Sequence, residues 1–296
     1  MSHFTVMVIG PDHDAQLAPY HEFECTGRVD QYVVDVDITD EFRQEMANAE
    51  DDQTPLEYAL EYYGYEDKVV ADESEVDRED AHQFGWVVVR DGELVRAVKR
   101  TNPNAQWDWY QVGGRWTGML KLKPGATGVQ GSPGLGSQGA KRGYADQARM
   151  GDIDWEGMRD EAGEKAGAYW DQVRAVSPNV WESWDSVQAR FPNDVAGARD
   201  FYHNQPGRQA LRQDRELVWC EDSVLVSREA YVQSARDSAG MTYAFLKDGV
   251  WMERGSMGWW GISTDEMPKN EWYARMREMI DSLDSDTLIT IVDCHI

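Results

Sequence analysis

Two short segments at opposite ends of the chain carry side chains that bind metals and transfer protons. Residues 21–25 read His-Glu-Phe-Glu-Cys, and residues 293–295 read Asp-Cys-His. Imidazole, thiolate and carboxylate groups are ligands for zinc. A carboxylate next to a metal-bound water can act as a general base and accept a proton from that water. One hypothesis is therefore a metal-dependent hydrolase of a nucleotide or related phosphate compound. Its zinc ligands would be His21, Cys25, Cys294 and His295, and its general base would be Glu22, Glu24 or Asp293.

The spacing of these residues leaves other uses open. Neither segment has the C-x-x-C or H-E-x-x-H pattern of established zinc motifs. Free cysteines are commonly buried as small apolar side chains, so Cys25 and Cys294 can belong to the core while His295 caps a sheet edge. A structural metal, with the function elsewhere, is a further alternative. The hydrolase hypothesis requires the two segments to lie within hydrogen-bond reach of each other.

Residues 101–118, TNPNAQWDWYQVGGRWTG, crowd three tryptophans and a tyrosine into an otherwise acidic protein. Alternate residues of a strand share a face, which predicts that Trp107 and Trp109 point one way while Asp108 and Tyr110 point the other. Large rings serve either cores or recognition surfaces, and this spacing suits both uses.

A glycine pair and a cation follow these rings. Gly113 and Gly114 would bend the strand and permit a close backbone approach. Arg115 beside Trp116 would then offer a cation and a ring to a base, a nucleotide phosphate or an acidic group of a partner. A second aromatic patch, GSMGWWG at residues 255–261, cannot direct both indoles into one core. The candidate binding residues are Trp107, Trp109, Tyr110, Arg115, Trp116, Trp259 and Trp260.

The charge of the chain restricts its partners. The formal net charge is -25, from 54 acidic and 29 basic residues. Residues 30–93 alone hold 21 Asp and Glu against 4 Lys and Arg. Such a surface repels a phosphate backbone, which predicts no direct binding of nucleic acid. The acidic segment is either a solvated face or a surface that competes with nucleic acid for a basic partner protein.

The cysteines and the apolar segments indicate a compartment. Cys25, Cys220 and Cys294 are too few and too widely spaced for a disulfide framework, which favours the cytoplasm. The first residues, MSHFTVMVIGPDHD, lack a basic region and a small-residue cleavage site, so we expect a strand and not a signal peptide. No stretch reaches the about 18 apolar residues of a membrane span. We therefore expect a cytoplasmic protein without a membrane partner.

The hydrophobic pattern predicts an α+β fold with a mixed, largely antiparallel sheet. Strands are expected at both chain termini, over residues 4–9 and 286–296, and we expect them to lie near each other. Two Asp-Gly turns, at residues 91–92 and 248–249, predict hairpins. Helical spacing dominates residues 153–211 and 266–283. Residues 216–226 have the composition of another strand.

The glycine-rich tract at residues 124–143 suggests how the chain is divided. Its Gly, Ser and Pro content is typical of a loop or linker. The tract ends in Lys141 and Arg142, which would suit an anionic ligand, although the residue order of a phosphate-binding P-loop is absent. We expect an N-terminal α+β part at residues 1–123 that includes the acidic segment, a loop or linker at 124–150, and a helical segment that returns to the sheet at 151–296.

Several segments together resemble a family of uncharacterised phage and bacterial proteins. They are SHFTVMVIG, LAPYHEFECTG, TNPNAQWDWYQVGGRWTG, GYADQA and the final DCHI. The resemblance covers both ends and the middle of the chain. It implies a phage or mobile-element setting, in which small acidic proteins of the host cytoplasm often act against host enzymes or defence systems. It carries no established activity.

Two functions follow from these observations. The preferred interpretation is a non-catalytic intracellular binding protein of phage type. It would engage a host defence protein with a basic face, or a small nucleotide, through its Trp-rich loops and acidic surface. The alternative is the metal-dependent hydrolase, with zinc held by the residues of the two termini.

Overall fold

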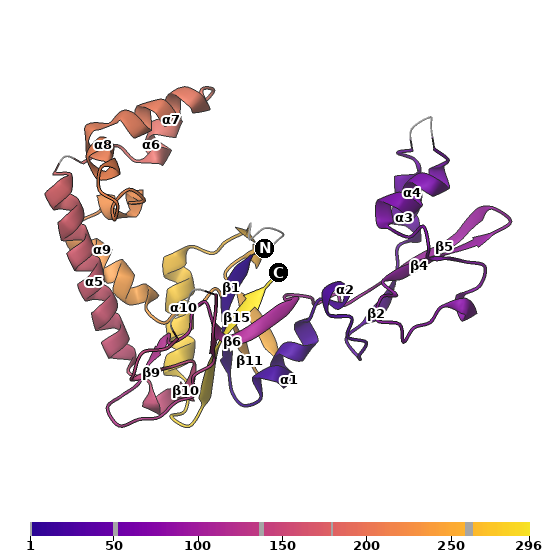
Figure 1. The fold of residues 1–296 in the computed structure, drawn as a ribbon, viewed down its shortest axis with the longest axis horizontal. Helices are drawn as coiled ribbons and strands as arrows, with labels where there is room; N and C mark the ends of the chain where they lie inside the picture. Colours follow the sequence, from indigo (N-terminus) through magenta and orange to yellow (C-terminus); the bar gives the residue numbers. More distant parts are fainter. Residues whose placement is uncertain (1, 50–52, 136–138, 179, 258–262) are drawn as a thin grey trace.

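The two ends of the chain lie side by side in the central sheet of a computed structural model (Figure 1). The structure describes residues 2–49, 53–135, 139–178, 180–257 and 263–296. Strands occupy both termini, and most of the described helices lie between them, which confirms the predicted α+β class. In these residues no helix combines the length and the apolar character that a membrane crossing needs.

The central sheet is built around the pairing of its first and last strands. Strand β1 (His3–Ile9) runs antiparallel to β15 (Leu288–His295), from His3 opposite His295 to Ile9 opposite Ile289. Beyond β1 lie β11 (Ala244–Lys247) and β12 (Val250–Glu253). Beyond β15 lie β6 (Trp109–Gly114) and β8 (Ser132–Pro133), and β10 (Gln147–Arg149) pairs with the first residues of β15. Apart from β1–β11 and β6–β8, the described strand pairs of this sheet are antiparallel, as predicted.

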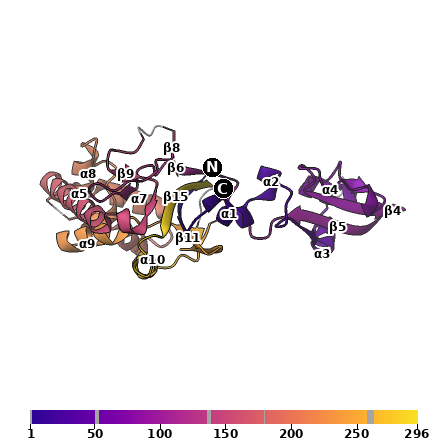
Figure 2. The ribbon, with the colours of Figure 1, turned by 90° about the horizontal axis from the view of Figure 1, so that it is seen from below.

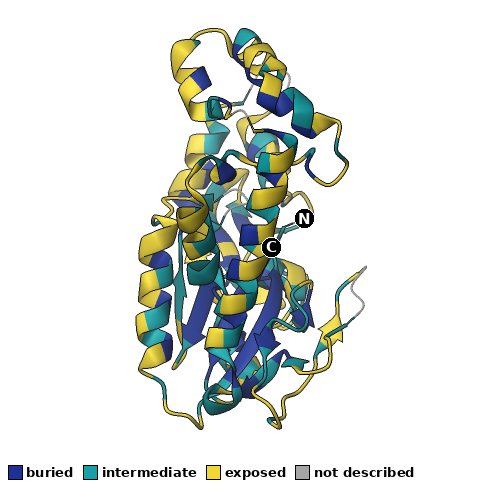
Figure 3. Ribbon diagram, turned by 90° about the vertical axis from the view of Figure 1, so that its left-hand side faces the viewer, coloured by how far each residue is buried: buried dark blue, intermediate teal, exposed yellow. Residues whose placement is uncertain are grey.

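Helices cover both faces of this sheet, so β1 is apolar at nearly every position. Met7 and Ile9 pack under α10 (Lys269–Asp281), whose Trp272 belongs to the same cluster. Val6 and Val8 face the other way, toward α1 (His13–Leu17). This alternation follows from the two-residue repeat of a strand. Figure 3 shows the buried strands behind the helices.

The acidic segment forms a separate lobe that projects from the central sheet (Figures 1 and 2). Its sheet has the order β2 (Val34–Asp37), β5 (Glu93–Thr101), β4 (Gly85–Arg90) and β3 (Val69–Val70). Helices α3 (Thr39–Met46) and α4 (Pro55–Tyr63) bury their apolar residues against it. Phe42 and Ala59 from these helices meet Val87 and Ala97 from the strands. The lobe therefore has a hydrophobic core of its own.

Both Asp-Gly hairpins are present as predicted. Asp91 and Gly92 join β4 to β5 with φ angles of 50° and 81°. Asp248 and Gly249 join β11 to β12 with φ angles of 53° and 74°. Positive φ at both central positions matches the twist of two antiparallel strands, and Asp and Gly tolerate it best.

The remaining helices form an extension at the opposite side of the sheet from the lobe (Figure 1). Asp154 caps the long helix α5 (Trp155–Val176) with its side chain, which accepts from the backbone N–H of Gly157. Apolar residues of the extension, among them Val173, Val187 and Leu211, gather in one cluster. The helices are α5 (Trp155–Val176), α6 (Trp184–Arg190), α7 (Val195–Asn204), α8 (Pro206–Arg212) and α9 (Arg228–Ser238).

The predicted strand at residues 216–226 is wrong. This segment consists of turns and the short 3-10 helix η4 (Asp222–Leu225). Its buried residues Leu217, Cys220 and Val224 recur every three or four positions, which is a helical spacing. They pack in the core of the helical extension, so the β-branched composition fills a helical cluster there and not a sheet.

The segment after β6 folds back along the central sheet. Strand β7 (Leu120–Lys121) pairs with β9 (Tyr144–Ala145), and Val129 bridges Gln147. Residues of the expected loop or linker at 124–150 thus contribute β8, β9 and β10.

The remaining short elements described in the structure are η1 (Ala18–Tyr20), α2 (Phe23–Thr26), η2 (Glu73–Glu75), η3 (Met150–Asp152), β13 (Ser256–Met257) and β14 (Ser263–Thr264).

A buried carboxylate holds this segment in place. Asp146 has no exposed surface, and its two oxygens accept from the backbone N–H groups of Gly118 (2.5 Å) and Gly131 (2.8 Å) and from the hydroxyl of Thr117 (2.9 Å). A Cβ atom on Gly113 would lie 2.7 Å from the same carboxylate. Only glycine therefore allows the chain to pass so close to Asp146.

Replacement of this carboxylate should destabilise the protein strongly. Asp146→Ala leaves three partly buried donors without their acceptor, and we expect the free energy of unfolding to fall by about 3 kcal/mol. Urea denaturation followed by circular dichroism measures the change. Asp286→Ala is the matched control, because that side chain is 88% exposed and pairs with Arg149 on the surface. Equal midpoints for the two variants would contradict the anchoring role.

Candidate functional site

The pairing of the termini lines up polar side chains across three strands of the central sheet. His3 on β1 lies opposite His295 on β15, and His295 lies opposite Trp109 on β6. In the next row of the same face, Asp293 lies between Thr5 and Gln111. The antiparallel register therefore gathers residues from positions near 3, 109 and 295 on one patch of the sheet.

The first of two histidine–aspartate pairs joins β1 to β15. Nδ1 of His3 lies 2.7 Å from Oδ1 of Asp293, whose side chain is 1% exposed. The backbone N–H of Arg115 donates to the other oxygen of Asp293 at 2.8 Å. Gly114 adopts a φ of 56° beside this carboxylate, and a Cβ atom there would lie 2.3 Å from that of Asp293. The glycine pair thus closes the backbone around the buried aspartate.

The second pair joins β15 to the start of β6. Nδ1 of His295 lies 2.7 Å from Oδ1 of Asp108, and the two imidazole rings of His3 and His295 have centroids 4.9 Å apart. A carboxylate has no proton to donate, so each Nδ1 carries the hydrogen. Within the described residues neither Nε2 has a hydrogen-bond partner. A carboxylate on Nδ1 fixes the ring and makes Nε2 the basic atom, as in general bases and metal-binding histidines.

An exposed indole borders the paired histidines. Trp109 is 47% exposed, and its ring meets His3 edge to face at 6.0 Å between centroids. Arg115 is exposed, and its backbone is fixed by Asp293. An aromatic surface and a guanidinium group therefore lie at the two ends of β6, the strand next to the one that carries His295.

The other predicted binding residues have structural contacts or cannot be described. Trp107 is buried, donates from Nε1 to the carbonyl of Leu17 at 3.0 Å and packs against Tyr110. The expectation that Trp107 shares a face with Trp109 is wrong, because β6 begins only at Trp109 and Trp107 pairs with His21 instead. Tyr110 donates to Asp14, and Trp116 packs against the cluster under α10. Trp259 and Trp260 lie outside the described residues.

The four expected zinc ligands do not come together. His21 has no exposed side-chain surface, and its ring nitrogens lie 2.8 Å from the hydroxyl of Thr26 and 3.3 Å from the carboxylate of Asp30. Cys294 is buried in the apolar cluster on the α1 side of the sheet, whereas its neighbours in β15 face the other way. Cys25 and His295 remain near Asp108.

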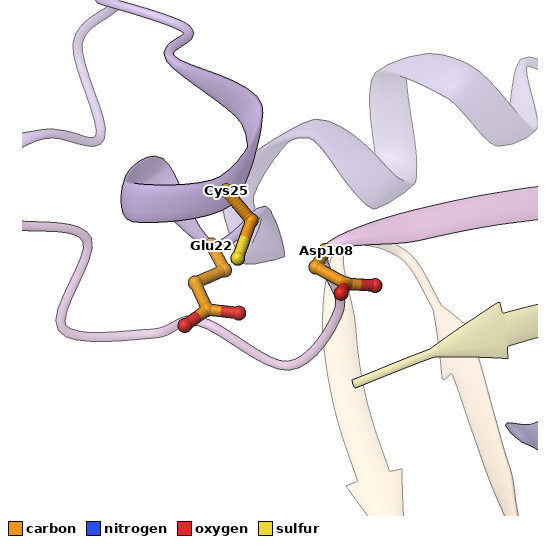
Figure 4. Close-up of side chains that lie close together, drawn as sticks. All are labelled: Glu22, Cys25 and Asp108. Carbon is orange, nitrogen blue, oxygen red and sulfur yellow. The ribbon is translucent and has the colours of Figure 1, made fainter. Parts of the chain in front are cut away.

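The expected general bases also have different surroundings. Asp293 is the buried partner of His3, and Glu24 pairs with Lys99 at 3.4 Å. Glu22 instead belongs to a compact group with Cys25 and Asp108 (Figure 4). One carboxylate oxygen of each acid and the sulfur of Cys25, the atoms that could bind a metal, all lie within 4.8 Å of one another. His3 was not predicted as a site residue. Its position opposite His295 follows once the terminal strands are paired antiparallel and in register.

Burial and neighbouring charges shift the pKa values of Glu22 and Cys25. Partial burial raises the pKa of Glu22, which accepts a hydrogen bond from the Cys25 thiol. Partial burial of the sulfur and the negative charge of Glu22 raise the pKa of Cys25 to about 11, although the residue as a whole is exposed. Cys25 is therefore a thiol at neutral pH and not an activated nucleophile.

Alkylation kinetics test this protonation state. In buffer with a chelator at pH 8, Cys25 should react with iodoacetamide about ten-fold more slowly than a small-peptide thiol, because less of it is thiolate. The rate should keep rising with pH toward about 11. Glu22→Gln removes the neighbouring charge and should raise the rate at pH 8. Peptide mass spectrometry separates Cys25 from the buried Cys220 and Cys294. A Cys25 rate at or above that of the peptide would contradict the raised pKa.

Comparison with known proteins gives no family for this chain. No family model, no curated protein and no solved structure matches it. Its function must therefore be inferred from the side chains that the sheet brings together, and among these the two histidine–aspartate pairs have the clearest chemistry.

Proposed function

We propose that the protein binds a nucleotide or related small phosphate compound at the patch formed by His3, His295 and Trp109, and hydrolyses it. The observation that carries this proposal is the pair of imidazoles 4.9 Å apart, each with its Nδ1 held by a carboxylate. Two rings at this separation can reach the same phosphate group. Orientation of both rings before the substrate arrives lowers the entropic cost of the reaction.

The two histidines would divide the proton transfers. A neutral imidazole takes a proton from the attacking water through Nε2, and a protonated one donates to the leaving oxygen. Asp293 and Asp108 are positioning residues, because they hold the Nδ1 hydrogens and stabilise positive charge on the rings. Asp293 is the more rigid of the two, since it is buried and also accepts from the backbone of Arg115.

The surroundings favour a small substrate. The exposed indole of Trp109 can stack on a base, and the guanidinium of Arg115 can pair with a phosphate. The net charge of -25 repels a long polyanion, whereas a single nucleotide meets only the charges near the site, which include the carboxylates of Asp108 and Asp293 and the cation of Arg115. A nucleotide therefore fits the local chemistry better than a nucleic acid.

Substitution of either histidine should abolish turnover. Protein incubated with nucleoside mono-, di-, tri- and cyclic phosphates is assayed for released phosphate and for changed nucleotides. His3→Gln and His295→Gln should each lower kcat by at least 100-fold, the range lost with a general acid or base. His82→Gln in the acidic lobe is the control and should keep full activity. Thermal unfolding confirms that the variants are folded. Unchanged kcat in both histidine variants, or no turnover of any substrate by the wild type, would refute the hydrolytic role.

The exposed indole should contribute to binding. Trp109→Ala should weaken nucleotide affinity by about 10- to 100-fold, as expected for loss of one base-stacking ring. Isothermal titration calorimetry measures the dissociation constant. Trp219→Ala is the matched control, because Trp219 is 86% exposed in the helical extension, far along the chain from the site. Equal affinities of the two variants would exclude base stacking on Trp109.

A second candidate function is supported by the acidic lobe. The lobe has its own core and projects into solvent, and Val34 and Val36 are exposed on its edge strand β2. We propose that it attracts a partner protein with a basic face, such as a host defence protein in a phage setting. A complex that weakens as salt rises, and that survives His3→Gln, would support this second function.

A further inference from the structure

Glu22 and Cys25 have no role in the proposed reaction, yet they form a compact group with Asp108, the residue that positions His295. Glu22 precedes α2, Cys25 lies within it, and Asp108 precedes β6. Figure 4 shows that the three side chains lie close together, with the Cys25 sulfur between Glu22 and Asp108. One thiol and two carboxylates are thus assembled from segments more than 80 residues apart in the sequence.

Backbone hydrogen bonds fix the three residues before any ligand arrives. The N–H of Glu22 donates to the carbonyl of Trp107 at 2.7 Å, and the N–H of Asp108 donates to the carbonyl of His295 at 3.0 Å. The N–H of Thr26 donates to the carbonyl of Glu22 at 3.0 Å, which holds the turn that carries Cys25. The group is therefore attached to the end of the central sheet and not to a free loop.

The donor atoms are spaced for a single ion. All three lie within 4.8 Å of one another. Zinc binds thiolate at about 2.3 Å and carboxylate oxygen at about 2.0–2.2 Å, so ligands of a tetrahedral ion lie roughly 3.5 Å apart. Small side-chain rotations close the remaining distance. Three protein ligands leave a fourth position open.

The charges around the group also favour a bound cation. In the described part of the chain, no Lys or Arg forms an ion pair with Glu22 or Asp108, and the nearby Lys99, whose charge acts on Glu22, pairs with Glu24. Among the described residues, the carboxylate of Glu22 accepts from the Cys25 thiol, and that of Asp108 accepts from Nδ1 of His295. One oxygen of the adjacent Glu24 is buried without a hydrogen-bond partner in the same described part. Partly buried acids are normally paired with cations or coordinate a metal.

We propose that Glu22, Cys25 and Asp108 bind a zinc-class divalent ion, with His295 orienting Asp108 from behind. A hydrogen bond to a ligating carboxylate is the usual support of a metal site. On binding, the S–H bond of Cys25 breaks, its proton passes to buffer, and a sulfur–metal bond forms. The soft sulfur selects zinc or cobalt over magnesium and calcium. This site shares Asp108 with the proposed hydrolysis, but its ion can be measured without turnover.

Cobalt provides a direct probe of the sulfur ligand. Chelator-treated full-length protein is titrated with Co²⁺, and the thiolate-to-cobalt charge-transfer absorption in the near ultraviolet is recorded. We expect one equivalent to saturate the band, and Zn²⁺ but not Mg²⁺ to displace it. Cys25→Ser should abolish the band, and Cys220→Ala, which removes a different free cysteine, should retain it.

The affinity for Zn²⁺ tests whether the two carboxylates are ligands. Glu22→Gln and Asp108→Asn should each weaken Zn²⁺ binding at least 10-fold in competition with a chromophoric chelator, while His82→Gln should bind like the wild type. Cys25 is exposed, so its serine variant should fold, and circular dichroism verifies this. A charge-transfer band that persists in Cys25→Ser, a wild type that binds no Co²⁺, or unchanged Zn²⁺ affinity in both carboxylate variants would overturn the proposal. None of these results would affect the assay of His3→Gln.

Discussion

The antiparallel pairing of β1 with β15 is the interaction on which the rest of the structure depends. It places the first and last strands at the centre of the main sheet, with apolar residues on both faces. Helix α10 packs on one face and α1 on the other, so neither helix has a surface to cover unless the termini meet. The same register puts His3 opposite His295. The candidate site and the core therefore arise from one set of backbone hydrogen bonds.

Two buried aspartates extend this constraint to the rest of the sheet. The carboxylate of Asp293 accepts a hydrogen bond from the backbone N–H of Arg115. The carboxylate of Asp146 accepts hydrogen bonds from the backbone N–H groups of Gly118 and Gly131. Each carboxylate occupies space that a side chain on Gly114 or Gly113 would need. The two buried carboxylates thus explain why glycines occupy positions 113 and 114. Because buried carboxylates tolerate no loss of their donors, this part of the sheet has little freedom to rearrange.

Local patterns in the sequence predicted the elements better than their arrangement. The terminal strands and both Asp-Gly hairpins were predicted because β-branched runs and turn residues act over a few positions. The segment 216–226 was wrongly predicted as a strand, because its residues favour β-structure. In the structure, Leu217, Cys220 and Val224 pack in the core of the helical extension. Cys25 was selected as a candidate ligand from its residue type. Its neighbour Asp108 was not selected as a candidate ligand. Asp108 is brought to Cys25 by the backbone hydrogen bond between Glu22 and Trp107, and this contact spans 85 positions and has no local signature in the sequence.

The meeting of the two termini at one end of the sheet has a mechanical consequence. The first residue of β1 lies opposite the last residue of β15, so a force that separates the two chain ends pulls across the strands and not along them. The hydrogen bonds of the central ladder would then break one after another, beginning at His3 and His295. Strands loaded in this unzipping direction resist far less than strands sheared along their length. Tension on the termini would therefore dismantle the histidine patch before it disturbed the lobe or the helical extension.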